Sequence, residues 1–123
     1  MSEETQKQNA KEPSLTVFML VKTQPVWLEF PVAKRFAEGD KYLKPILQKH
    51  AGTVTLRMFD TEFYATRVTD LWMWETTSRH AYELVIEELR ETPFWDNYFN
   101  IVELLPAVEN AAARNYQRPA LTA

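Results

Sequence analysis

The segment Thr66–Glu75, with the sequence TRVTDLWMWE, constrains the fold of this chain more than any other. Side chains alternate between the two faces of an extended strand, so Asp70, Trp72 and Trp74 share one face. The opposite face carries Arg67, Leu71 and Met73. Both faces are largely apolar, whereas an ordinary antiparallel sheet keeps one polar face in water. The segment therefore predicts a sheet that needs a cover on both faces, of which the helices of this chain can supply one.

The composition limits the class of protein. A chain of 123 residues is one domain with room for a substantial core. A net charge of −3 without a basic run argues against nucleic-acid binding. The absence of cysteine from the sequence excludes disulfides, thiolate metal sites and cysteine nucleophiles. The polar start is neither a secretory signal nor an anchor, and no stretch approaches the ~20 apolar residues of a membrane span, so we expect a cytoplasmic protein.

The order of predicted elements indicates an α+β fold. Apolar, β-branched runs predict strands over 15–22, 53–60, 66–75 and 98–105. Helical spacing predicts one helix over 32–50 and a second that begins after Ser78. The order β-α-β-β-α-β is that of a ferredoxin-like fold, a four-stranded antiparallel sheet with two helices on one face. We expect a disordered tail over 1–13, a single domain over 14–116 and a second tail over 117–123.

Several local features refine this outline. Pro45 should kink or divide the first helix, because proline removes a backbone donor. The second helix carries the clearest amphipathic stripe, and Thr92-Pro93 ends it. We expect a short connector over 26–30, a last strand stopped by Pro106, and a short helix over 108–116.

The faces of the sheet predict self-association. We expect an aliphatic set under the helices, made of Leu56, Met58, Leu71 and Met73. The outer face would then carry Phe18, Leu20, Arg57, Phe59, Asp70, Trp72 and Trp74. On the last strand, either Asn100 and Val102 or Ile101 and Glu103 would face outward. Large aromatic side chains that are exposed to solvent form an apolar patch that favours association. We therefore expect two sheets to pack face to face in a homodimer, a dimeric α+β barrel.

Arg57 and Asp70 are the candidate polar pair of this outer face. If the hairpin turns around Phe63-Tyr64, the two residues lie opposite each other, and Asp60 faces Arg67. A slip of two residues would instead place Arg57 over Trp72. No Asn-Gly or Asp-Gly turn decides between the two registers.

The same face supplies candidate ligand-binding residues, each of which also has a structural explanation. Trp72 and Trp74 would stack on a flat ligand that Arg57 and Asp70 orient, with Phe59 and Tyr64 as further candidates. Trp27, Trp95 and Tyr98 could line the same pocket. All of these aromatic side chains could instead simply fill a core or an interface. His80 is a candidate acid or base near the start of the second helix, although an exposed histidine is the simpler interpretation. Two separated histidines and no ligand spacing predict no metal site, and no motif indicates a cofactor.

Four segments resemble the darcynin family: Leu15–Lys22 (LTVFMLVK), Arg57–Tyr64 (RMFDTEFY), Arg67–Glu75 (RVTDLWMWE) and Glu87–Trp95 (EELRETPFW). The resemblance spans about residues 15–116. It implies a small bacterial or fungal protein with a dimeric, α+β barrel-like fold, and it implies no catalytic residue.

Three functions remain open at this level. The first is a homodimer that binds a small apolar or aromatic molecule in a barrel or helix–sheet pocket. The second is a non-catalytic assembly or interaction protein with a fully packed dimer core. The third, by analogy of fold alone, is a small cofactor-free oxygenase or cyclase.

Overall fold

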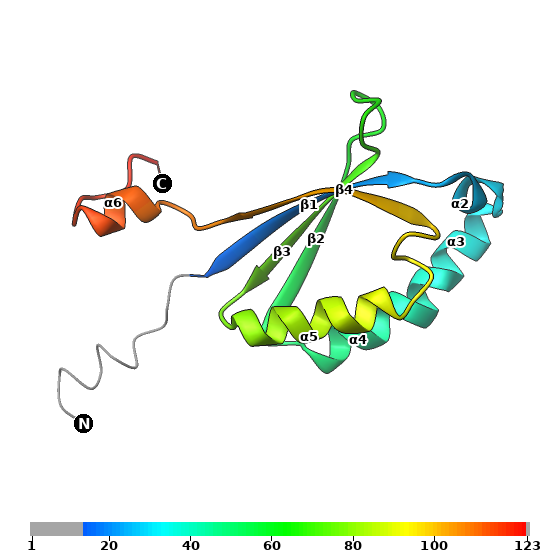
Figure 1. Cartoon of the computed structure of the whole chain (residues 1–123), viewed down its shortest axis with the longest axis horizontal. Coiled ribbons are helices and arrows are strands. Elements are labelled where there is room, and N and C mark those ends of the chain that lie inside the picture. Colours follow the sequence, from blue (N-terminus) through cyan, green and yellow to red (C-terminus); the bar gives the residue numbers. More distant parts are fainter. Residues whose placement is uncertain (1–13, 123) are drawn as a thin grey trace.

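The computed structural model describes residues 14–122 and confirms the α+β architecture. Four strands, β1 (Leu15–Thr23), β2 (Val54–Asp60), β3 (Asp70–Thr76) and β4 (Phe99–Ala107), form one antiparallel sheet in the order β2-β3-β1-β4. Helices α4 (Lys44–Lys49) and α5 (Arg79–Arg90) lie on one side of the sheet, as Figure 1 shows. The ferredoxin-like prediction is therefore confirmed. The predicted tail over 1–13 lies outside the described residues.

The predicted first helix is divided in the manner expected from Pro45. It consists of α3 (Val32–Glu38), the wider π-helical turn η1 (Gly39–Leu43) and α4, in whose first turn Pro45 lies. Proline has no amide hydrogen and its ring clashes with the carbonyl four residues earlier. A helix that continues through such a residue must widen or bend just before it.

Two predicted boundaries were wrong. The connector over 26–30 is a short helix, α2 (Pro25–Glu29), with Pro25 at its first turn, where the missing amide costs nothing. Strand β4 runs through Pro106 to Ala107. Because β4 is an edge strand, it can accommodate a residue that donates no hydrogen bond. The short helix expected over 108–116 is α6 (Ala111–Asn115).

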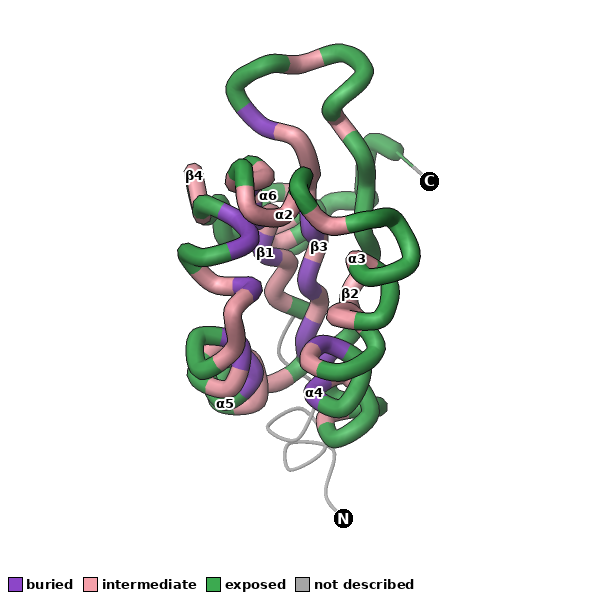
Figure 2. The backbone as a smooth tube through the Cα atoms, turned by 90° about the vertical axis from the view of Figure 1, so that its right-hand side faces the viewer, coloured by how far each residue is buried: buried purple, intermediate pink, exposed green. Residues whose placement is uncertain are grey.

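The core lies between the sheet and the helices. From β1, Val17, Met19 and Val21 are at most 2% exposed, and Trp72 and Trp74 of β3 are 1% and 0% exposed. Val85 and Leu89 of α5 complete this layer, and Ser78 caps that helix by accepting a hydrogen bond from the Ala81 amide at 3.1 Å. In Figure 2 the buried positions of α4 and α5 lie toward each other and toward the sheet.

The predicted register of the hairpin was wrong, and with it the assignment of the faces. Asp60 lies opposite Asp70, and Arg57 lies opposite Met73, so neither register considered from the sequence occurs. Residues 61–69 form a loop, and β3 begins only at Asp70. The displacement from the predicted register is an odd number of residues, so it also reverses which side chains of the two strands share a face.

Trp72 and Trp74 therefore face the helices, together with Leu56 and Met58, whereas Leu71 and Met73 face outward. Indole side chains bury more apolar area than Leu or Met, and that favours the more enclosed side of the sheet for them. The outward direction of Phe18 and Leu20 is as predicted, because they lie opposite Met73 and Leu71. On β4 a bulge at Val102 changes the alternation, so Asn100 and Glu103 both lie on the outer side.

Candidate functional site

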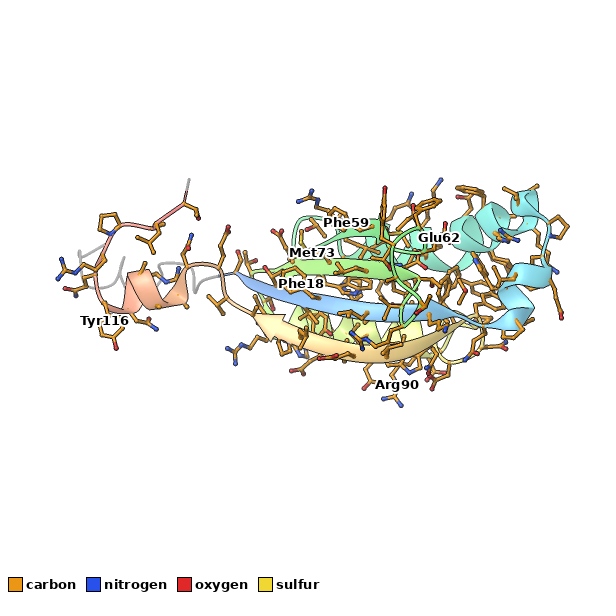
Figure 3. The ribbon with its side chains drawn as sticks, turned by 90° about the horizontal axis from the view of Figure 1, so that it is seen from above. Phe18, Phe59, Glu62, Met73, Arg90 and Tyr116 are labelled. Carbon is orange, nitrogen blue, oxygen red and sulfur yellow. The ribbon has the colours of Figure 1, made fainter. Side chains whose placement is uncertain are left out.

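The uncovered side of the sheet is the first candidate surface, and we call it the outer sheet face. Figure 3 looks onto the sheet from the side away from α5, with Phe59 of β2, Met73 of β3 and Phe18 of β1 labelled on this side. These side chains, like Leu20 and Leu71, remain partly or fully exposed in the single chain. The apolar part of the outer sheet face consists of Phe18, Leu20, Phe59, Leu71, Met73 and Leu105.

The loop over 61–69 limits this face at one end. The Lys22 side chain donates a hydrogen bond to the Thr66 carbonyl at 2.9 Å, and Arg67 forms an ion pair with Glu103 of β4 at 3.5 Å. The predicted pairing of Arg67 with Asp60 was therefore wrong. Since Lys22 and Glu103 belong to β1 and β4, these contacts hold the loop across the strands. Figure 1 shows the loop rising on the side of the sheet away from the helices.

Arg57 lies on the outer sheet face without the predicted carboxylate partner. Its guanidinium carbon is 5.2 Å from the centre of the Phe59 ring, within the range of a cation–π contact. Phe59 is 41% exposed, and Tyr64 in the loop is 94% exposed. Arg57 and Phe59 thus share a surface, whereas Tyr64 contacts only its neighbour Phe63 among the aromatic rings of the described residues.

Asp70 lies on the helix side of the sheet, at the end of β3 nearest the loop. The Thr69 hydroxyl donates a hydrogen bond to its carboxylate at 2.7 Å. Burial, and then the nearby carboxylates of Asp60 and Glu62, raise the pKa of Asp70 to about 6, although the Thr69 hydrogen bond opposes this shift. Asp70 is therefore a carboxyl group that changes its charge near neutral pH, and Arg57 does not neutralise it.

The two tryptophans belong to the packed layer and do not line an open pocket. Trp72 lies edge-on to Phe99 with 4.9 Å between ring centres. Neither indole N–H of Trp72 and Trp74 has a hydrogen-bond partner among the described residues. His80 is exposed on the first turn of α5. The structure therefore brings together Arg57 and Phe59, and separates them from Asp70, Trp72 and Trp74 by the thickness of the sheet.

The end of the helix–sheet layer near α2 is also filled by aromatic rings. Trp27 of α2 lies 5.1–5.5 Å, between ring centres, from Phe94, Tyr98 and Phe99. The Tyr98 hydroxyl donates a hydrogen bond to Glu38 at 2.8 Å, and burial followed by this carboxylate raises the pKa of Tyr98 to about 12. This end of the layer is a packed core, so the aromatic residues serve to hold α2 and α3 on the sheet.

A second candidate surface lies at the opposite end of the sheet, where β1 begins and β3 and β4 end. A cleft of about 500 Å³ separates α6 from the body of the protein, and we call it the arm cleft. Its wall carries two arginines, Arg79 at the start of α5 and Arg114 in α6. The other lining residues are Leu15, Thr76, Thr77, Val108, Ala111 and Asn115.

A neighbouring hollow of about 530 Å³ shares Leu15, Arg79 and Val108 with the arm cleft. It adds the rings of Tyr82 and Pro106, together with Ala107 and Glu83. The two hollows therefore meet along one wall. This wall carries Arg79 of α5 in both hollows, Arg114 of α6 in the arm cleft, and apolar groups along β4. Figure 1 shows α6 beyond this end of the sheet.

None of the residues that line the arm cleft was predicted from the sequence to be a site residue. Arg79 and Arg114 are 35 positions apart, each in an unremarkable polar context. They meet only because β3 leads into α5 and β4 leads toward α6 at the same end of an antiparallel sheet. The predicted order of elements could have suggested this, since the segments that follow the third and fourth strands leave the sheet at the same end.

Within 14–122, no three His, Asp or Glu side chains gather closely enough to hold a metal ion. No helix in the described part of the chain is long and apolar enough to cross a membrane.

The fold has counterparts among solved structures. A mutant chlorite dismutase from Candidatus Nitrospira defluvii matches with a TM-score of 0.69 and 10% identity, over 92% of this chain and 47% of that chain. Chlorite dismutase from the same organism in complex with imidazole matches with a TM-score of 0.67 and 10% identity, over 85% and 43% of the two chains. The present chain spans less than half the length of these structures, and the likeness concerns the fold alone.

Sequence comparison relates the chain to smaller proteins. A Darcynin homolog from Granulibacter bethesdensis is 67% identical over 112 residues, which cover 91% of this chain and 90% of the homolog. A second Darcynin homolog, from Streptomyces avermitilis, is 50% identical over 105 residues, or 85% and 87% of the two chains. The family model described as "Darcynin, domain of unknown function" matches residues 1–123. The chain therefore belongs to the Darcynin family.

Proposed function

We propose that this protein acts as a homodimer in which two outer sheet faces pack against each other. The observation that supports the proposal is an apolar area on the side of the sheet against which no helix of residues 14–122 packs. Two neighbouring cross-strand rows form it, Phe59–Leu71–Leu20 and Met73–Phe18–Leu105. Burial of apolar surface stabilises by roughly 25 cal/mol per Å², and a patch of this kind marks an interaction site. In a dimer with two-fold symmetry, the same surface of each copy packs against that of the other, so both apolar areas are buried in one interface.

The rim of the outer sheet face supports the same arrangement. Polar groups surround the apolar part of the outer sheet face. They belong to Arg57, Glu75 and Glu103, which lie on the same side of the sheet. An apolar centre with a polar rim is the usual anatomy of a protein–protein interface. The packed layer on the helix side favours a structural role for Trp72 and Trp74 over a ligand-binding role.

The test compares two methionines on opposite faces of the sheet. Light scattering should give the native protein a mass of about twice 14.5 kDa. Met73→Lys places a charge at the centre of the interface and should yield a monomer, since an unpaired charge is costly to bury. Met58→Lys is the matched control, because Met58 is 52% exposed and lies on the helix side. A native monomer, or a Met73→Lys dimer as tight as the native one, would contradict the proposal.

A second candidate function is the binding of a small apolar or aromatic molecule. The observation that favours it is the pair of adjoining hollows at the α6 end, which the packed helix–sheet layer does not fill. Tyr82 and Pro106 offer flat apolar contacts there. Titration of the 15N-labelled protein with 2-naphthol should shift the amide signals of Thr77 and Tyr82 and leave those of Phe30 and Phe94 in place. Shifts confined to the aromatic cluster around Trp27 would contradict this location.

A further inference from the structure

We propose that the arm cleft binds the oxyanion group of a small organic acid, a carboxylate or a phosphate monoester, whose apolar body lies along the adjoining hollow. The inference rests on the second candidate function, small-molecule binding, and adds the chemical class of the ligand. It is tested separately from the proposed dimer, because none of the residues that line the two hollows belongs to the apolar part of the outer sheet face.

The charge of the arm cleft is the first argument. Among residues 14–122, the ionisable groups that line it are the two guanidinium groups of Arg79 and Arg114. No ion pair among residues 14–122 includes either of them. Within the described part of the chain, the Arg114 side chain donates one hydrogen bond, a long contact of 3.4 Å to the Glu109 carbonyl. Two cations that share a cleft without a described carboxylate between them favour an anion, in a chain whose net charge is −3.

The geometry of a guanidinium is the second argument. It presents planar pairs of N–H donors that match carboxylate and phosphate oxygens. Thr77 and Asn115 line the same cleft and add a hydroxyl and an amide donor. The helix dipole of α5 is not needed, because Ser78 already caps its first turn.

The distribution of polar groups over the two hollows gives the orientation. Glu83 lines only the second hollow, where it would repel an anionic group. The oxyanion should therefore lie beside Arg79 and Arg114, with the apolar body against Leu15, Tyr82 and Pro106. A ligand of this kind has one charged end and one flat apolar end.

Three probes that share one ring system test the inference: 2-naphthoate, 2-naphthyl phosphate and neutral 2-naphthol, each titrated into the full-length 15N-labelled protein at pH 7. Both anions should bind at least tenfold more tightly than 2-naphthol and shift the amide signals of Thr77, Arg79 and Arg114. A preference for one anion identifies the carboxylate or the phosphate as the better match.

The variants are Arg79→Met and Arg114→Met, each of which should weaken anion binding at least tenfold while 2-naphthol binding stays constant. Both side chains are exposed, so the fold should tolerate the changes. The matched control is Arg90→Met, on the last turn of α5, which should bind as the native protein does. Equal affinity for all three probes would overturn the anion inference and leave small-molecule binding intact. Absence of binding by any probe would overturn both.

Discussion

Asp70 places a carboxyl group at the partly buried end of β3, beside two other carboxylates. Its pKa of about 6 lies above the usual value of 3.8, chiefly because burial disfavours the charged form. A raised pKa means that the folded state favours the proton. The contribution of Asp70 to stability is therefore greatest below pH 4 and is lost as the pH rises through 6.

We accordingly expect Asp70→Asn to stabilise the protein above pH 7, by about 1–2 kcal/mol after allowance for partial exposure, because the amide carries no charge. At pH 4 the two proteins should unfold with nearly the same free energy. Urea unfolding at pH 4 and pH 8 measures both values, with Asp96→Asn at an exposed position as the control. A destabilised variant at pH 8 would show that Asp70 has a cationic partner in solution.

The sequence predicted which side chains of β3 share a face, but not which face of the sheet that is. The alternation in β3 correctly placed Asp70, Trp72 and Trp74 on one face. Which face that is depended on the register with β2, and no short turn fixes that register. The loop over 61–69 is too long for its sequence to define the pairing of the strands, so the partners of Arg57 could not be predicted.

At the scale of elements, a charged cluster joins α4 to α5. Glu88 of α5 accepts a hydrogen bond from Lys49 at 2.6 Å and lies 2.5 Å from the Nε2 atom of His50. Only 11% of the His50 side chain is exposed, so this histidine belongs to the contact between the helices. The hydrogen bonds from Lys49 and His50 lower the pKa of Glu88.

A lowered pKa means that this cluster stabilises the protein above the ordinary pKa of glutamate and ceases to do so as the pH falls through the lowered value. Glu88→Gln should therefore cost about 1 kcal/mol at pH 7, since the group is partly exposed, and nothing measurable at pH 2. Thermal unfolding at the two pH values provides the measurement, and exposed Glu87→Gln is the control. Equal losses from both variants would contradict a specific contact between the helices.

Elements with strong local determinants were predictable. The Ser78 cap and the apolar stripe of α5 came directly from the sequence, and Pro45 indicated the division at η1. The short helix α2 was missed because its sequence, PVWLE, has no capping side chain and too few residues for a periodic pattern. Its stability comes from packing of Trp27 against Phe94 and Phe99, which are distant in the sequence.

For the whole molecule, the prediction of a sheet covered on both faces is the central claim. The helices cover one face by packing on Met19, Trp72 and Trp74. The other face has the loop over 61–69 at one end and α6 beyond the other, with apolar side chains between them (Figures 1 and 3). In the proposed dimer, a second copy would cover this surface.

The most direct test observes contacts between copies at Met73. A sample mixes one copy, labelled with 13C at its methionine methyl groups, with an unlabelled copy, and isotope-filtered NOE spectra report only contacts between the two. The account predicts intermolecular NOEs from the Met73 methyl group to leucine and phenylalanine protons of the partner, and none from Met19, which is 0% exposed in the core. A dimer without intermolecular NOEs at Met73 would contradict the account, because its two copies would meet through another surface.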